Sequence, residues 1–168
     1  MSTGPGVDPR SVDPSAFGET TLPSDPQALA EACGRAMWAR DHASQALGMR
    51  LDEIGPGRAV MQMRVRIDML NGHGSCHGGF IFALADSCFA FACNSYNQVC
   101  VAAGCQIDYL APAGEGELLL AEGVERARSG RSGVYDIRVS NEQGATVALM
   151  RGRSRRLEGS VVDAPPKP

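Results

Sequence analysis

The spacing of hydrophobic residues changes along the chain, and each spacing predicts a different element. From Leu29 to Leu47 the apolar residues form an imperfect helical stripe that follows Asp25, a residue able to cap a helix, and ends before Gly48. From Ala59 to Ile67 apolar residues alternate with polar ones, as in a strand with one buried face. The sequence therefore predicts an amphipathic helix of about twenty residues, followed by one or two strands. The core-facing strand positions would be Ala59, Met61, Met63, Val65 and Ile67.

The segment 78–94 is apolar on every face, and Asp86 is its only charged residue. A helix that is hydrophobic all round is enclosed by protein. Turn residues separate four strand-like runs that follow it, near 98–110, 117–127, 132–141 and 144–157. A long buried helix followed by hairpin-linked strands predicts an α+β fold, in which an antiparallel β-sheet curls around that helix and the first helix is an extra N-terminal element.

The two ends of the chain lack this patterning. Residues 1–24 and 159–168 are rich in Gly, Pro, Ser and Asp, and they have too few apolar residues to offset the entropy lost on ordering. We therefore expect a disordered N-terminal extension over 1–24, one folded domain over 25–158, and a disordered C-terminal tail over 159–168.

Composition narrows the class of protein. The chain has 168 residues, a formal net charge of -3 and six cysteines. This length fits one domain, and the charge offers no general attraction for nucleic acid. No stretch is long enough for a bilayer span, no signal sequence is recognisable, and several cysteines lie inside apolar runs. We therefore expect a cytoplasmic protein that binds neither nucleic acid nor membrane.

No metal is expected. His73, Cys76 and His77 lie close together in the sequence, but no second pair of Cys or His residues at ligand spacing completes a zinc site.

A polar, glycine-rich loop, LNGHGSCHGG (70–79), runs directly into the predicted buried helix. Glycines at a helix N-terminus let another molecule approach the free N–H groups and the positive end of the helix dipole. Gly78 and Gly79 are therefore candidate oxyanion-hole residues. The alternative is that these glycines only cap the helix, and that His73 and His77 bond to loop carbonyls.

Asp86 is the second anomaly, because burying a carboxylate costs free energy unless it is paired, hydrogen-bonded or protonated. A carboxylate in a partly dry setting suits a general base or a nucleophile. The alternative is a structural role, in which Asp86 accepts hydrogen bonds from its own helix turn or from a strand.

The loop and Asp86 are too far apart to act together easily within one chain. Asp86 follows Gly79 by seven residues, so the two share a helix face but lie about 10 Å apart along the axis. Two copies of the helix, antiparallel across a two-fold axis, would bring each Asp86 to the glycine-rich N-terminus of the other chain. We therefore expect an obligate homodimer with two composite sites.

The stretch LNGHGSCHGGFIFALADSCFAFACN resembles the signature of the hotdog-fold acyl-CoA thioesterases of the PaaI-type, phenylacetate-pathway family. IDYLAP (107–112), GVYDI (133–137) and VALMRG (147–152) resemble the family as well. The resemblance implies a hotdog fold, dimers that share a continuous sheet, and commonly homotetramers built from two dimers. It also implies hydrolysis of acyl-CoA thioesters with no cofactor, since coenzyme A is part of the substrate.

The resemblance also assigns roles to individual residues. Asp86 matches the catalytic carboxylate, and Asn71 matches the loop asparagine that helps to place the water or the thioester. Gly78 or Gly79 matches the backbone donor that polarises the thioester carbonyl, and His77 matches the histidine of the HGG motif, which orients the loop.

One feature of some relatives is missing here. They carry a catalytic Ser or Thr on the strand after the helix, and this chain has Ala102, Ala103 and Gly104 at that place. A hydroxyl role on that strand is therefore in doubt.

Coenzyme A needs anchors for its phosphates, and arginines suit that role. Arg128 and Arg131, near a predicted hairpin turn, and Arg153, on the last strand, are the candidates; a solvated strand edge that blocks association is the competing explanation. His73 and Phe80, beside the loop, are candidate substrate contacts, and packing in the core is the alternative for Phe80.

The expected reaction is hydrolysis of an aryl-acetyl thioester, such as phenylacetyl-CoA or hydroxyphenylacetyl-CoA, to the free acid and CoA. Asp86 would either deprotonate the attacking water or attack the thioester itself. A non-catalytic acyl-CoA-binding module and an enoyl-CoA hydratase or dehydratase are the alternatives on the same fold. Asp86 argues against the first, and the His-Gly-Gly sequence with a helical carboxylate argues against the second.

Overall fold

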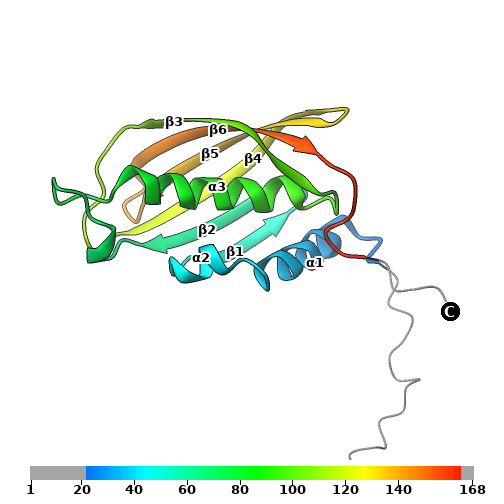
Figure 1. Ribbon diagram of the computed structural model, residues 1–168, viewed down its shortest axis with the longest axis horizontal. Helices are drawn as coiled ribbons and strands as arrows, with labels where there is room; N and C mark the ends of the chain where they lie inside the picture. The colour runs from blue at the N-terminus through cyan, green and yellow to red at the C-terminus, as the bar shows by residue number, and fades with distance from the viewer. Residues whose placement is uncertain (1–21, 164–168) are drawn as a thin grey trace, which may run out of the picture.

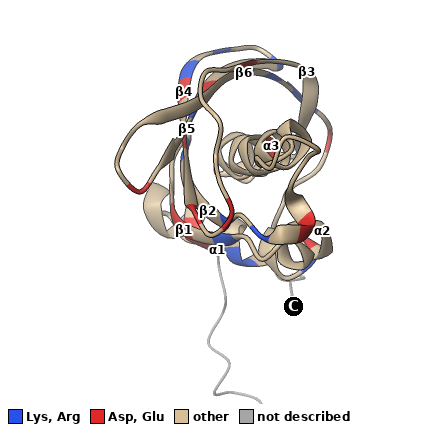
Figure 2. Cartoon of the chain, turned by 90° about the vertical axis from the view of Figure 1, so that its left-hand side faces the viewer, with Lys and Arg blue, Asp and Glu red and all other residues tan. Residues whose placement is uncertain are grey.

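An antiparallel sheet of six strands curls around one long helix, which confirms the predicted fold class (Figures 1 and 2). The computed structural model describes residues 22–163. Viewed along α3 in Figure 2, the strands wrap around the helix and α1 and α2 lie beside β1 and β2. The elements in chain order are α1 (Pro26–Trp38), α2 (His42–Ala46), β1 (Arg50–Gly55), β2 (Arg58–Arg64), a 3-10 turn (Ile67–Met69), α3 (Gly78–Asn94), β3 (Cys100–Tyr109), β4 (Leu118–Ser129), β5 (Ser132–Asn141) and β6 (Thr146–Arg156).

The predicted N-terminal helix is in fact two helices. α1 begins as expected, with Pro26 in its first turn and an Asp25 carboxylate oxygen that accepts from the Ala28 N–H at 2.8 Å. The helix ends at Trp38, and Asp41 then caps α2 by accepting from the Ser44 N–H at 3.0 Å. The prediction of one helix was wrong because Asp41, a second capping aspartate, starts a new helix within the apolar stripe.

The predicted alternation holds along β2 and fails just beyond it. Ala59, Met61, Met63 and Val65 are buried, whereas Ile67 is 72% exposed. The strand ends before Ile67, and the 3-10 turn changes which face of the chain points to the core. The prediction that Ile67 lies in the core was therefore wrong.

Strand β3 lies at an edge of the sheet, far from the strand that follows it in sequence. The strand order is β1-β2-β4-β5-β6-β3, so within residues 22–163 β3 pairs only with β6. The β4–β5 and β5–β6 pairs are the predicted hairpins, but β3 and β4 are not neighbours. This ten-residue strand therefore has one edge that no other strand of the described residues pairs with.

Helix α3 lies in the hollow of the sheet over the predicted range 78–94. Glycines allow the sheet to approach it, since a Cβ at Gly152 would lie 2.9 Å from the ring of Phe89. One side of the helix is less well covered, because Phe80, Phe82 and Ala90 are only half-buried. The prediction that α3 is enclosed by protein therefore holds for only part of its surface within one chain.

The expectations for the ends have different outcomes. Of the predicted disordered extension 1–24, residues 1–21 lie outside the described residues. The predicted disordered tail 159–168 is wrong for its first residues, because the amide of Asn97 bonds to Val161 and Val162 through both its oxygen and its nitrogen. The composition of this tail did not show that Asn97, far away in sequence, would satisfy its backbone groups.

Candidate active site

The loop before α3 is held in a tight shape by its own polar groups. The Asn71 side-chain oxygen accepts from the N–H groups of His73 at 2.8 Å and Ser75 at 3.3 Å, and its nitrogen donates to the Ser75 hydroxyl at 3.1 Å. Gly74 has a φ of 76°, a conformation that favours glycine. Within the chain, Asn71 therefore shapes the loop, and its half-buried amide lies beside the helix start.

His77 caps α3. Its ring Nδ1 accepts from the Gly79 N–H at 3.0 Å, so the neutral ring carries its proton on Nε2. The ring is exposed and meets Phe80 edge-on, with centroids 6.3 Å apart. The alternative expected His77 to bond to a loop carbonyl, whereas its ring instead caps the helix by accepting from the Gly79 N–H; the His73 side chain is exposed on the loop.

Tyr109 completes the helix start, and the sequence reasoning missed it. Its hydroxyl donates to the Gly78 carbonyl at 2.9 Å, and its ring lies so close that a Cβ on Gly78 would be 3.0 Å away. Packing against the Tyr109 ring therefore favours glycine at position 78. The tyrosine within the IDYLAP segment is the sequence signal, but nothing local indicates its contact with residue 78.

A cavity of about 400 Å³ opens at this end of α3. Its lining combines the loop, the first turns of the helix and the segment after β3. The lining residues are Asn71, Ser75, Cys76, Gly78, Ile81, Tyr109, Leu110, Ala111 and Pro112. A larger hollow of about 700 Å³ lies between α1 and β1 and contains none of the predicted site residues.

Asp86 lies in the middle of α3 and faces the edge strand β3. Its carboxylate is half-buried, and the Cys105 thiol donates to Oδ1 over 3.8 Å. Burial raises the pKa of Asp86, and the hydrogen bond from Cys105 lowers it. Loss of water is the larger cause, so the carboxylate is a stronger base than an exposed aspartate.

The structure does not bring Asp86 and the helix start together within one chain. Asp86 is absent from the residues that line the 400 Å³ cavity. Seven residues separate it from Gly79 along a continuous helix, which corresponds to about 10 Å.

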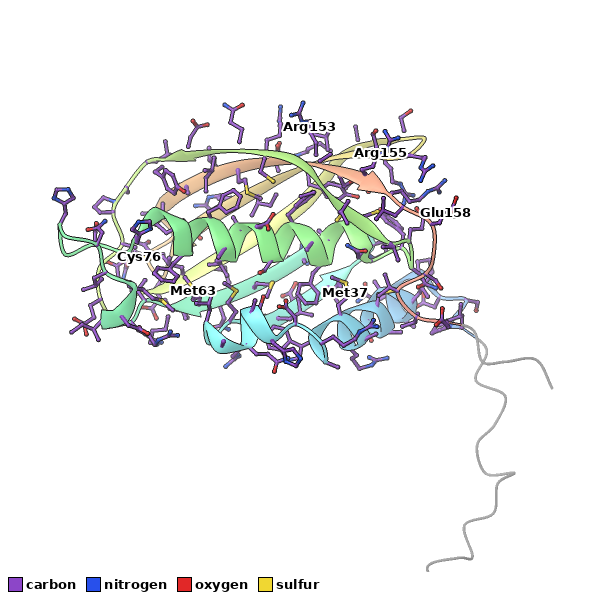
Figure 3. All side chains as sticks on the ribbon, viewed as in Figure 1. Met37, Met63, Cys76, Arg153, Arg155 and Glu158 are labelled. Carbon is purple, nitrogen blue, oxygen red and sulfur yellow. The ribbon has the colours of Figure 1, made fainter. Side chains whose placement is uncertain are left out.

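The candidate arginines neither line the cavity nor bond to Asp86. Arg128 stacks on the Tyr96 ring at 3.8 Å, beyond the C-terminal end of α3. Arg131 donates to the Arg156 carbonyl at 3.0 Å. Arg153 lies on the face of β6 that points away from α3, beside Arg155 (Figure 3). Within one chain, none of the three arginines lines the cavity at Gly78.

Two classes of site are not found in residues 22–163. No group of three His, Cys, Asp or Glu side chains is arranged to hold a metal ion there, and Cys76 is buried while His73 and His77 are exposed. Over the same residues, no helix has the length and apolar character needed to cross a membrane.

Comparison with known proteins identifies the family to which this fold belongs. The Thioesterase superfamily profile matches residues 73–148, which include the loop from His73 onward, α3, strands β3 to β5 and the first residues of β6. The acyl-coenzyme A thioesterase PaaI of Escherichia coli K12 is 46% identical over 126 residues, which are 75% of this chain and 90% of that protein. The chain belongs to the thioesterase superfamily, in its hotdog fold.

Solved structures show the same relationship. The E. coli PaaI protein, from the phenylacetic acid degradation operon, superposes with a TM-score of 0.80 and 43% identity over 81% of this chain and 99% of that one. The smu.793 protein of Streptococcus mutans, solved with acetyl CoA bound, has a TM-score of 0.64 and 25% identity over 67% of this chain and 90% of its own. Within the superfamily, the chain is a PaaI homologue.

Proposed function

We propose that the protein hydrolyses an acyl-CoA thioester to a carboxylic acid and CoA, with an aryl-acetyl group such as phenylacetyl or hydroxyphenylacetyl as the acyl part. The half-buried Asp86 carboxylate on α3 carries the proposal, because it is a desolvated base in the middle of a thioesterase fold. The similarity to E. coli PaaI supports the aryl-acetyl class. The acetyl CoA in the S. mutans homologue supports a CoA thioester as ligand.

The proposed chemistry needs a base and an oxyanion donor. Asp86 takes a proton from water as the water oxygen attacks the thioester carbon, or it attacks that carbon itself and water then cleaves the mixed anhydride. The carbonyl oxygen gains negative charge beside the backbone N–H of Gly78 at the start of α3, or beside that of Gly79 once the Gly79 N–H releases the bond that it donates to His77 Nδ1. In the first route the C–S bond breaks next, and CoA leaves as a thiol with the proton that Asp86 took from water. In the second route the C–S bond breaks as the mixed anhydride forms, and the CoA thiolate takes its proton from the water that cleaves the anhydride.

We propose that two chains build each site. Edge strand β3 carries the exposed apolar side chains Val101 (44%) and Tyr109 (50%), and Leu110 (58%) follows it directly; a second β3 paired with this edge would bury them. An antiparallel pair would place α3 of one chain against α3 of the other in the opposite direction. Asp86 of one chain would then approach Gly78 and Asn71 of its partner.

The same arrangement gives the substrate-binding residues a role. His73 and Phe80 flank the acyl end of the site at the helix start, whereas Arg128 and Arg131 lie at the opposite end of α3. In an antiparallel dimer those arginines approach the partner's site, where they would meet CoA phosphates. Arg153, on the outer face of β6, would contact only a nucleotide that passes over the sheet edge.

We also propose a homodimer or homotetramer in the cytoplasm, with no cofactor beyond the CoA of the substrate. All six cysteines are free thiols, which fits a reducing compartment.

The test is release of free thiol from a panel of CoA esters. Phenylacetyl-CoA and hydroxyphenylacetyl-CoA should be hydrolysed faster than acetyl-CoA, and crotonyl-CoA should not be hydrated. Asp86→Asn keeps the side-chain shape and should lower turnover by about two orders of magnitude or more, while CoA still binds. Hydration of crotonyl-CoA, or equal turnover by Asp86→Asn, would reject the proposal.

A further inference from the structure

The edge strand β3 places one thiol directly against the Asp86 carboxylate. The Sγ atom of Cys105 lies 3.8 Å from Oδ1 of Asp86. In the described part of the chain, this thiol is the side chain that donates a hydrogen bond to that carboxylate. Both groups are half-buried, so water competes for this contact less than it would at the surface.

We propose that Cys105 is a positioning residue for the hydrolysis: its thiol orients the Asp86 carboxylate and stabilises the ionised form that accepts the proton. This inference rests on the proposed function, because it concerns the same carboxylate. Cys105 itself is not the nucleophile.

The electrostatics of the pair support a thiol that stays protonated. Burial and the Asp86 charge both raise the pKa of Cys105, while Arg153 lowers it by a smaller amount. The thiol therefore remains a donor at neutral pH and is a poor nucleophile. For Asp86, the same hydrogen bond opposes the rise in pKa that burial causes.

Other ionisable groups around α3 have partners other than Asp86. On the helix itself, Cys88 donates to the carbonyls of Ala59 and Ala121, and Cys93 lies near Cys100 at the C-terminal end. On β5 and β4, the Tyr135 hydroxyl donates to Glu125 at 2.9 Å.

Two further elements pack near Asp86. From α2, Ser44 shares a 2.8 Å hydrogen bond with Ser87, and His42 is exposed. Arg151, Arg153 and Arg155 of β6 are exposed on its outer face, and Arg153 acts on Cys105. None of these groups contributes to the pKa shift of Asp86, so Cys105 is the partner to test.

A thiol is chemically suited to this position. A hydroxyl would donate a stronger hydrogen bond, hold the carboxylate more firmly in its ionised form and weaken it as a base. A methyl group would leave the desolvated carboxylate without a donor. A weak donor orients the base and leaves most of its basicity intact.

The first experiment compares pH profiles of kcat/KM for the full chain and for Cys105→Ala and Cys105→Ser. The acid limb should move to higher pH in Cys105→Ala, by about half a pH unit, and to lower pH in Cys105→Ser. The plateau should fall about three- to tenfold in both, through kcat more than through KM. Cys100→Ala is the matched control on the same strand, and its acid limb should stay in place. Acid limbs of both Cys105 variants that coincide with wild type would overturn the inference.

The second experiment tests the coupling between Cys105 and Asp86 in the absence of catalysis. Asp86→Asn removes the charge that raises the thiol pKa, so iodoacetamide should alkylate Cys105 several times faster than in the parent at mildly alkaline pH. Both proteins carry Cys100→Ser, and mass spectrometry identifies the modified residue. If the reagent reaches Cys105 in neither protein, the ultraviolet absorbance of the thiolate is titrated instead. A thiol pKa unchanged by Asp86→Asn refutes the coupling, whereas absence of thioester hydrolysis by wild type would reject only the proposed function.

Discussion

The hydroxyl of Tyr109 donates to the backbone carbonyl of Gly78 over 2.9 Å, which ties the end of edge strand β3 to the first turn of α3. The N–H groups of that turn are the proposed oxyanion donors. Their position therefore depends on a strand that follows the helix in sequence and pairs at the far side of the sheet.

Tyr109→Phe tests this tie, because it keeps the ring and removes the donor. We expect kcat to fall about three- to tenfold, with a smaller change in KM, since the helix start would be held less firmly when charge develops on the carbonyl oxygen. Steady-state kinetics with phenylacetyl-CoA measures both constants. Unchanged kcat would mean that the ring alone positions the first turn.

Mixing two inactive variants tests the composite site. Asp86→Asn and Asn71→Ala each damage a different part of the site, so a mixed dimer has one site with both residues intact and one with neither. Random reassociation should restore about a quarter of wild-type activity. Activity is measured after denaturation and renaturation of the mixture, with native mass spectrometry to confirm heterodimers. Heterodimers without activity would show that both residues serve the same chain's site.

Asp86→Asn should also affect stability, in a direction set by burial. Because the pKa of Asp86 is raised in the folded protein, ionisation opposes folding, and stability is lost as pH rises through the unfolded and then the folded pKa. The asparagine variant should therefore melt at the same or a higher temperature than wild type at pH 8. The two should converge at acidic pH, where the carboxyl is neutral in both states.

The measurement is the melting temperature as a function of pH, at equal protein concentration because the assembly affects it. A variant that melts well below wild type at pH 8 would show that the carboxylate makes stabilising contacts in the assembly.

Gly152→Ala tests how closely the sheet approaches α3. The added Cβ would lie 2.9 Å from the Phe89 ring, which is itself 1% exposed. We expect a loss of about 1–3 kcal/mol in the free energy of unfolding, measured by urea denaturation. Gly72→Ala is the matched control, because nothing lies within 4 Å of its Cβ.

Asn97 should stabilise the packing of the segment that contains Val161 and Val162. It has a φ of 57°, and its side chain bonds to the backbone of Val161 and Val162. Ending the chain at Ser160 should cost about 1 kcal/mol or more in wild type and much less in Asn97→Gly, which keeps the backbone conformation without the amide. Ending the chain at Asp163 should change little, because the Asn97 bonds remain. Thermal melts test this coupling between Asn97 and the C-terminal residues. The five proteins are wild type, Asn97→Gly, each of these two ending at Ser160, and wild type ending at Asp163.

Much of the candidate site could be predicted because its residues carry their own signals. Asp86 stands out as a charge within an apolar helix, and Gly78 and Gly79 mark the place where a polar loop meets that helix. The spacing of hydrophobic positions predicted α3 and the four strands after it with bounds close to the observed ones. These features depend on residues near one another in sequence, where side-chain spacing and turn chemistry determine the outcome.

By itself, the sequence determined the fold class, the helix and strand periods, and the chemistry of the Asp86 and glycine-loop segments. Only the tertiary structure decided that β3 crosses to the edge beside β6, and that crossing places Cys105 against Asp86 and Tyr109 against Gly78. It also decided that Asn97 would order the residues after Gly159. The physical reason is that each contact joins residues whose partners are chosen by strand order and by packing around α3, which no local pattern of polar and apolar residues encodes.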